Sequence, residues 1–301
     1  MAARIAPGRS EASPPEVGVV MQVVRRSLAA TLVAALLAAV PATALVAQSE
    51  EPGAVSEELA VVTLGADAIP EDLAGVLFFR KIYPTGAEIS YSGGFVPPNT
   101  FARYVESGEL GIRPVSETSV VRAGATWDDA ELVAGGEETV VQAGDAFVMH
   151  EVPWDEYGPQ ALGEMWTPGE DAHVVGFAIR ENQRCCSMSH AGMQSPWYGT
   201  LVEGVEALRG SPVTLRIDRW ELPAGEILPA TPADVPTIRF LDAGELVARS
   251  QAVDDEAEPL TLEFKAGRSL QLPMTIDVES LVFESAGPDP AVVYELRVEP
   301  A

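Results

Sequence analysis

Histidines close to carboxylates are the residues of this chain with the clearest capacity for catalysis. The sequence has three histidines. His150 ends an apolar run and is followed by Glu151 and Asp155, and an imidazole beside a carboxylate can work as a general acid–base pair. These three residues are candidate catalytic residues, although a strand-end histidine capped by neighbouring acids is the simpler interpretation. A metal held by His150, His173 and a carboxylate would require their two strands to be neighbours.

Two adjacent cysteines, Cys185 and Cys186, are the second chemical candidate. Neighbouring Cα atoms lie about 3.8 Å apart, which is shorter than the usual disulfide span, so a bridge between them would be strained and easily reduced. The alternatives are an intermolecular disulfide or two free thiols. Both cysteines are therefore candidate redox residues.

The overall charge and the missing motifs narrow the functional classes. The chain holds 45 acidic and 19 basic side chains, a formal net charge of −26, so neither a nucleic acid nor an anionic lipid surface is an expected partner. Two cysteines are too few for a multi-cysteine zinc or iron–sulfur site. The sequence also lacks the G-x-S-x-G, P-loop, dinucleotide-binding and H-E-x-x-H motifs.

The N-terminal residues 1–47 have the pattern of an export signal. Two arginines, Arg25 and Arg26, precede an uncharged run from Ser27 to Val40, and Ala42-Thr-Ala44 follows as an A-x-A cleavage site. We expect cleavage near Ala44 and an extracellular, periplasmic or cell-surface location, with no membrane contact after cleavage.

Two further interpretations concern this end of the chain. The apolar segment 27–47 is long enough to remain as an uncleaved helix that anchors the protein in a membrane. Residues 48–58 are polar and acidic, which predicts a disordered leader.

Short strands separated by turns must position all of these residues. The runs are rich in β-branched residues, alternate in polarity and are bounded by Gly, Pro or Asp, which predicts an all-β sandwich or barrel. The one expected helix is Thr200–Arg209, closed by Gly210. The clearest strand patterns are 75–83, 101–110, 138–142, 146–150, 173–179, 213–222, 236–247, 260–264, 280–283 and 292–298.

An internal repeat divides the rest of the chain into two similar units. Four sequence blocks recur in the same order, and three of them contain a glycine at the equivalent place: Gly86 and Gly225, Gly108 and Gly244, Gly144 and Gly267. The repeat predicts a first unit at 59–181 and a second at 212–301. A bridge at 182–211 carries both cysteines and the expected helix.

The repeated pattern of a Pro-Gly turn, "E-x-G-E-L" and "A-G-D" resembles the cupin superfamily. That resemblance covers residues 75–299 and implies two jelly-roll barrels in tandem, a bicupin, with dimers common. Cupin motifs bind a metal through two His, a Glu and a third His. The second repeat keeps the spacing of both motifs, but its four ligand positions are Thr231, Ala233, Thr237 and Val278.

The first repeat fits the cupin motifs more loosely, and its ligand positions have also changed. Phe101 stands at the Glu position, Phe95 lies near a His position and Asp155 stands at the position of the last His. Phe95 and Phe101 would make the interior of the first barrel apolar. We therefore predict no metal and no cofactor in either barrel.

A non-catalytic protein is the function that these observations favour. It would bind a small apolar or neutral molecule, or act as a structural or interaction module, and could form a homodimer. The alternative is a divergent cupin enzyme with its active site around His150. The candidate ligand-binding residues are Phe95, Phe101, Tyr104, Trp154, Asp155, Thr231 and Thr237.

Overall fold

The computed structural model describes the two repeats and parts of their connections. The described residues are 20–21, 53–66, 69, 73, 75–92, 100–150, 162–180, 193–201, 204–232, 234–250, 261–270 and 281–301. Among them, two single-turn 3₁₀ helices, η2 (Trp127–Asp129) and η3 (Val205–Leu208), interrupt a chain of strands. The predicted signal segment lies outside the described residues, apart from 20–21. No helix among the described residues is both long and apolar enough to cross a bilayer.

The first repeat forms two antiparallel sheets that face each other. One sheet has the order β13-β3-β12-β5-β10-β7-β8, and the other has the order β4-β11-β6-β9. Their strands are β3 (Gly75–Tyr83), β4 (Glu88–Ser92), β5 (Thr100–Ser107), β6 (Glu109–Arg113), β7 (Thr118–Val121), β8 (Glu131–Val133), β9 (Thr139–Gln142), β10 (Ala146–His150), β11 (Leu162–Trp166), β12 (Ala172–Arg180) and β13 (Gln194–Leu201).

The second repeat has the same arrangement. Its sheets run β1-β2-β14-β21-β16-β19 and β15-β20-β17-β18. The strands are β1 (Val20–Met21), β2 (Val55–Leu64), β14 (Val213–Leu222), β15 (Ile227–Leu228), β16 (Thr237–Ala243), β17 (Glu245–Ser250), β18 (Thr261–Lys265), β19 (Arg268–Ser269), β20 (Leu281–Ser285) and β21 (Ala291–Pro300).

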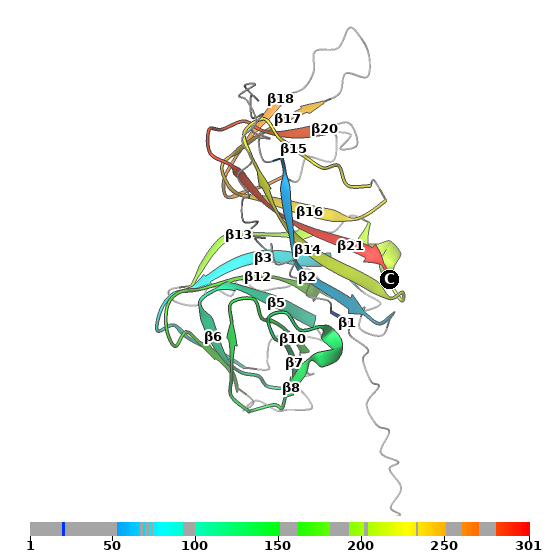
Figure 1. Ribbon diagram of the computed structural model, residues 1–301. Helices are drawn as coiled ribbons and strands as arrows, with labels where there is room; N and C mark the ends of the chain where they lie inside the picture. Colours follow the sequence, from blue (N-terminus) through cyan, green and yellow to red (C-terminus); the bar gives the residue numbers. More distant parts are fainter. Residues whose placement is uncertain are drawn as a thin grey trace, which may run out of the picture.

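The strand order identifies both units as jelly rolls. In the first, β3-β12-β5-β10 faces β4-β11-β6-β9, and in the second, β14-β21-β16-β19 faces β15-β20-β17-β18. This interleaving of early and late strands is the double Greek key of a jelly roll. The prediction of two cupin-like barrels in tandem is confirmed, and the barrels lie one above the other in Figure 1.

Each barrel borrows an edge strand from outside its own repeat. Strand β2 pairs with β14 of the second barrel, so residues 59–64, which were expected in the first unit, belong to the second barrel instead. Strand β13, which comes from the bridge, pairs with β3 of the first barrel. Figure 1 shows β2 running alongside β14, away from its sequence neighbour β3.

Two predictions are corrected by these edge strands. Residues 55–58 belong to β2 rather than to a disordered leader, because their backbone pairs with residues 218–221. The expected helix Thr200–Arg209 is wrong, since Thr200 and Leu201 continue β13 and only 205–208 form a helical turn. Gly204 separates the two elements with a φ of 76°, a conformation that ends regular structure at little steric cost for glycine.

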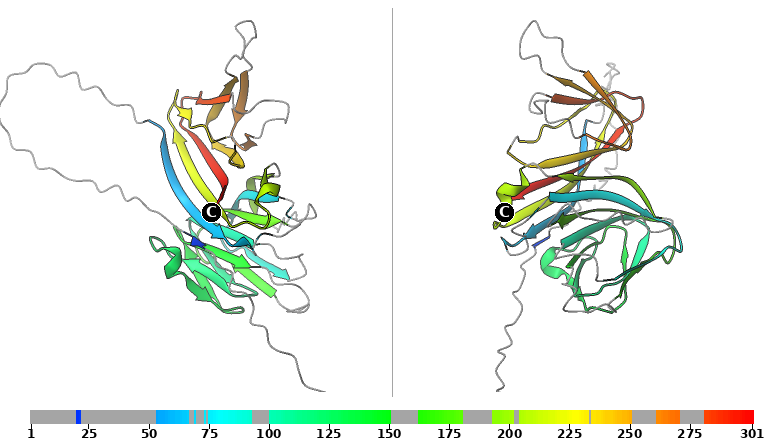
Figure 2. Two further views of the ribbon diagram at one scale, coloured as in Figure 1. Left: turned by 90° about the vertical axis from the view of Figure 1, so that its right-hand side faces the viewer. Right: turned by 180° about the vertical axis from the view of Figure 1, so that it is seen from behind.

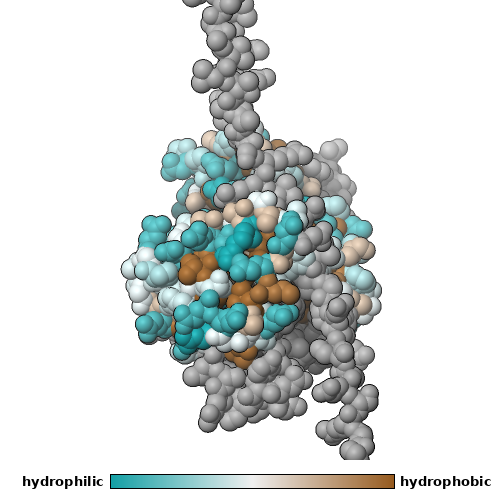
Figure 3. Space-filling model, turned by 60° about the horizontal axis from the view of Figure 1, so that its bottom comes forward, coloured by the Kyte–Doolittle hydropathy of each residue, from teal (hydrophilic) through white to brown (hydrophobic). Residues whose placement is uncertain are grey.

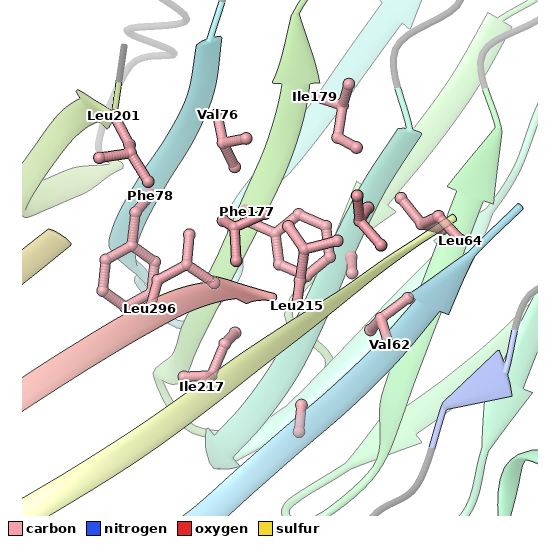
Figure 4. Packing of buried hydrophobic residues seen from close by; sticks show 14 of the residues in the cluster. Val62, Leu64, Val76, Phe78, Phe177, Ile179, Leu201, Leu215, Ile217 and Leu296 are labelled. Atoms are coloured by element: carbon pink, nitrogen blue, oxygen red, sulfur yellow. The ribbon is translucent and has the colours of Figure 1, made fainter. Parts of the chain in front are cut away.

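The largest apolar core lies between the two barrels rather than inside either one. It combines side chains from β3, β5 and β12 of the first barrel with others from β2, β14 and β21. Figure 4 shows Phe78 and Phe177 pointing from one sheet towards Leu215 and Leu296 of the other. Two smaller cores fill the barrels themselves. Figure 2 shows the same stack of barrels from two further sides.

The outer surface of the first barrel is more polar than these internal faces. Figure 3 shows its underside, where hydrophilic residues surround a few hydrophobic ones. Leu132 is 62% exposed on this barrel. The extensive apolar faces of the sheets are therefore covered within the molecule, and isolated apolar side chains remain outside, as is usual for proteins.

Candidate functional site

A pocket of about 620 Å³ opens on the inward-facing side of the larger sheet of the second barrel. That volume is in the range of small-molecule sites. Its walls come from β14, β16 and β21, from the loop at 229–231 and from the borrowed strand β2. The lining residues are Val55, Ser56, Glu57, Glu58, Arg216, Asp218, Trp220, Pro229, Ala230, Thr231, Arg239, Glu295 and Arg297.

Strand alternation explains why charged side chains line this pocket. On β14, Leu215 and Ile217 belong to the core between the barrels. Because successive side chains point to opposite faces of a sheet, Arg216 and Asp218 point into the second barrel. The same parity turns Glu295 of β21 inward. Both faces of this sheet are therefore covered, one by apolar and the other by charged side chains.

Arginines and carboxylates in the pocket form a continuous network. Glu295 is 2% exposed and pairs with Nε of Arg239 and, at 3.2 Å, with Nε of Arg297. Arg297 also donates to Asp218. The Thr231 hydroxyl donates to Glu295 at 3.2 Å.

Two further contacts hold the mouth of the pocket. Arg239 donates from Nη2 to the carbonyl of Pro229 at 2.8 Å, which anchors the loop over the barrel. Arg216 forms an ion pair with Glu58 of β2. The borrowed strand thus supplies part of the site, so the second repeat alone would not form it completely.

Burial controls the ionisation of this network. Removal from water raises the pKa of the Asp218 carboxyl, and the hydrogen bond from Arg297 acts against that rise. Burial by itself would lower the pKa of the Arg297 guanidinium, but its bond to Asp218 raises it overall. A charge buried with a partner is tolerated, whereas removal of one partner leaves the other uncompensated.

The arrangement presents hydrogen-bonding groups of both kinds without a large excess of charge. Three arginines and four acidic residues, Glu57, Glu58, Asp218 and Glu295, line the pocket. Trp220 also lines the pocket, and its Nε1 is buried without a described acceptor. Such a surface suits a ligand that is polar but carries no net charge.

Thr231 and Thr237 were both predicted to line the second barrel. Thr231 lies in the pocket and bonds with Arg239 and Glu295. The Thr237 hydroxyl instead donates to the carbonyl of Val235 at 2.9 Å, and this residue does not line the pocket. The sequence pattern does not predict a pocket role for Arg239, Glu295 and Arg297, because polar residues in an alternating strand indicate a solvent-facing side when the other side is apolar.

In the first barrel, Tyr104 and Phe101 lie on opposite faces of β5. Tyr104 is 5% exposed and belongs to the core between the barrels, so it does not line the barrel interior. Phe101 lies beside Arg103, whose guanidinium carbon is 5.5 Å from the centre of the Phe101 ring. The expectation of an apolar interior holds for the walls of the first barrel, but Arg103 also points into this interior.

The structure excludes a shared metal site for His150 and His173. His150 is opposite Thr100 at one end of β5, and His173 is opposite Ser107 at the other end. Seven residues of strand separate these partners, a distance of about 23 Å. His173 instead lies between the barrels, with Nδ1 3.3 Å from Nη2 of Arg80.

Several predicted residues lie outside the described part of the chain, and their placement stays a prediction. They are Phe95, Glu151, Trp154, Asp155, Cys185 and Cys186, and the side chain of His150 is also not described. Among the residues that the structure does describe, no group of three or more His, Cys, Asp or Glu is arranged to hold a metal ion.

Comparison with known proteins finds only distant structural likenesses. No family model matches the chain, and no curated protein matches it by sequence. The cupin 2 conserved barrel domain protein from Leptotrichia buccalis is 11% identical over 84% of this chain and 91% of that chain, with a TM-score of 0.25. Procruciferin, an 11S globulin from Brassica napus, is 12% identical over 80% and 81%, with a TM-score of 0.37.

Oxalate decarboxylase from Lactobacillus farciminis is 10% identical over 83% of each chain, with a TM-score of 0.32. These likenesses concern the arrangement of strands. The assignment of two cupin-like jelly rolls rests on the strand order of the chain itself.

Proposed function

We propose that this cupin-like protein is an exported, non-catalytic binding protein whose second barrel takes up a small, neutral, hydroxyl-rich molecule such as a saccharide or polyol. The pocket among Arg216, Asp218, Arg239, Glu295 and Arg297 carries the proposal. Export is supported by the signal-like segment at 1–47.

The balance of charge in the pocket favours a neutral ligand. Each arginine of the pocket already has a carboxylate partner, so a charged ligand would have to displace one of them or remain uncompensated. Hydroxyl groups can both donate and accept, and therefore suit a wall of alternating guanidinium and carboxylate groups. The indole of Trp220 adds an apolar surface.

A non-catalytic role follows from the second-barrel residues at the cupin ligand positions. Thr231 and Thr237 cannot replace imidazole or carboxylate as ligands of a divalent ion. We expect purified protein to contain less than about one equivalent of iron, manganese, zinc or nickel. Stoichiometric metal, measured by elemental analysis, would contradict the non-catalytic interpretation.

Ligand binding can be tested by blocking the pocket mouth. Ala230 is exposed and lines the pocket, so Ala230→Trp should obstruct entry without disturbing a core. Ala224 is also exposed but does not line the pocket, and Ala224→Trp is the matched control. Titration calorimetry with mono- and disaccharides and polyols should show binding that only Ala230→Trp abolishes. Equal binding by both variants would exclude this pocket.

A further inference from the structure

Two basic side chains inside the first barrel have no described carboxylate partner. Arg103 of β5 is 4% exposed, and Lys81 of β3 lies on the inward face of its strand, two residues before Tyr83, which belongs to the interior core. The ion pairs among the described residues include neither cation. The other clusters of partly buried arginines in the described chain include carboxylates.

Among the described residues, only weak contacts surround the Arg103 guanidinium. Its Nη1 lies 3.6 Å from Sδ of Met149 and 3.8 Å from Sδ of Met165, and thioether sulfur is a poor acceptor. Because β10 and β11 belong to opposite sheets, the side chain reaches across the barrel. The rings of Phe101 and Phe147 lie 5.5 and 5.6 Å from its guanidinium carbon.

Two buried donors in this region lack an acceptor. They are Nε of Arg103 and the hydroxyl of Tyr83, and Tyr83 is 1% exposed. Buried donors in proteins are almost always paired. Cation–π contacts offset only part of the free energy that an unpaired buried cation costs. A strong acceptor is therefore missing from the described interior.

The walls around these donors are apolar. The interior core of the first barrel consists of aliphatic, aromatic and methionine side chains, including Phe147, Met149 and Met165. Gly176, between Phe79 and Arg103 in the sheet, places no side chain in this interior. A monoanion with an apolar group matches these surroundings better than a multiply charged phosphate, whose desolvation is more costly.

We propose that Lys81 and Arg103 form a second binding site, inside the first barrel, for a small organic carboxylate that carries an apolar group. The carboxylate would accept from Arg103 and Lys81, and Tyr83 would supply a further donor. This site is separate from the pocket of the second barrel and does not depend on its function.

Lys81 would make binding sensitive to pH. Burial, and then the charge of Arg103, lower the pKa of the Lys81 ammonium from 10.5 to about 7. Its surroundings contain Phe79, whose ring centre is 4.9 Å from Nζ, and the titratable groups of Tyr83 and Arg103. Tyr83 has a pKa raised by burial and stays neutral near pH 7, so Lys81 alone changes charge there among the described groups facing it.

The test uses titration calorimetry of the purified protein with benzoate, hexanoate and inorganic phosphate. Both carboxylates should bind at about pH 6, where Lys81 is protonated, and their affinity should fall by up to about tenfold per pH unit above 7. Lys81→Met and Arg103→Met should each weaken binding by at least about tenfold. The exposed residues Lys265 and Arg249 provide matched controls as Lys265→Met and Arg249→Met.

Three results would show that this interior is not a carboxylate site formed by Lys81 and Arg103. Absence of carboxylate binding, phosphate binding in its place, or binding that is unchanged in Lys81→Met would overturn the proposal. If Arg103→Met fails to fold, Lys81→Met and Tyr83→Phe keep the proposal testable through the pH profile. Carboxylate binding should be unchanged in Ala230→Trp. The first-barrel site can therefore be confirmed or rejected even if the second-barrel pocket binds no saccharide or polyol.

Discussion

Trp197 is the side chain through which the bridge should hold the two barrels together. It lies on β13, which is paired with β3 of the first barrel, and its indole stacks on Phe240 of the second barrel at 4.6 Å with an interplanar angle of 11°. Its Nε1 donates to Oδ1 of Asp242 at 2.9 Å. Trp197 is 3% exposed. We predict that Trp197→Ala strongly destabilises the whole molecule.

The magnitude follows from what the substitution removes. Deletion of a buried tryptophan ring costs about 3–5 kcal/mol in transfer and cavity energy, and the lost bond to the Asp242 carboxylate places the value near the upper end. Asp242 keeps two bonds from Arg80, at 2.9 and 3.0 Å. Trp197→Phe retains most of the stacking and should therefore cost only about 1–2 kcal/mol.

Urea unfolding followed by far-ultraviolet circular dichroism measures these differences. Tyr198 is the matched control, because it is adjacent on β13 but 71% exposed, and Tyr198→Ala should change the free energy of unfolding by less than about 0.5 kcal/mol. The barrels share one core, so a single transition is expected. A loss below about 1 kcal/mol in Trp197→Ala would refute this account of the interface.

Three further predictions concern the barrels themselves. Gly244→Ala should cost at least about 1.5 kcal/mol more than Gly225→Ala in urea unfolding, because both have positive φ but only at Gly244 would a Cβ meet backbone, 2.7 Å from the Pro290 oxygen. Since its pKa is lowered, Lys81 makes the folded state bind fewer protons than the unfolded one between pH 7 and 10.5. Stability should therefore rise with pH in that window and fall as pH drops through it, and Lys81→Met should reduce this slope in unfolding at several pH values. Asp145→Ala should lower the free energy of unfolding by about 2–3 kcal/mol, because this 4%-exposed carboxylate accepts from two backbone amides and Arg122; a loss equal to that of an exposed acid would contradict it.

Repeated glycines made the barrel fold predictable from the sequence. Gly86 and Gly225, Gly108 and Gly244, and Gly144 and Gly267 all have positive φ. At Gly108 a Cβ would lie 2.3 Å from the Asp171 oxygen, and the equivalent Gly244 is similarly crowded. A positive φ and a close approach of backbone favour glycine at these positions. The two repeats therefore have glycines at the same spacing although the rest of their sequences differ.

The borrowed edge strands could not be predicted in the same way. β2 and β13 have ordinary strand patterns, and nothing local in a strand specifies a partner far away in the sequence. The pairing of β2 with β14 across about 150 residues depends on the match between two sheets. For the same reason, the contribution of Glu58 to the second-barrel pocket becomes visible only in three dimensions.

Because both faces of these sheets are covered, charged side chains on the strands do not all face solvent. A polar alternation indicates a solvated face when a sheet is covered once, but here the second face closes over a barrel interior. The chain has 19 basic side chains, and six of them lie within the barrels or between them: Arg80, Lys81, Arg103, Arg216, Arg239 and Arg297. Carboxylates accompany four of these arginines, namely Glu58, Glu106, Asp218, Asp242 and Glu295, so the outer surface keeps the strongly negative charge that the composition indicates. Such a surface favours solubility and repels anions, so an anionic ligand must gain its affinity from positive charge inside a barrel, which only the first barrel offers in excess among the described residues.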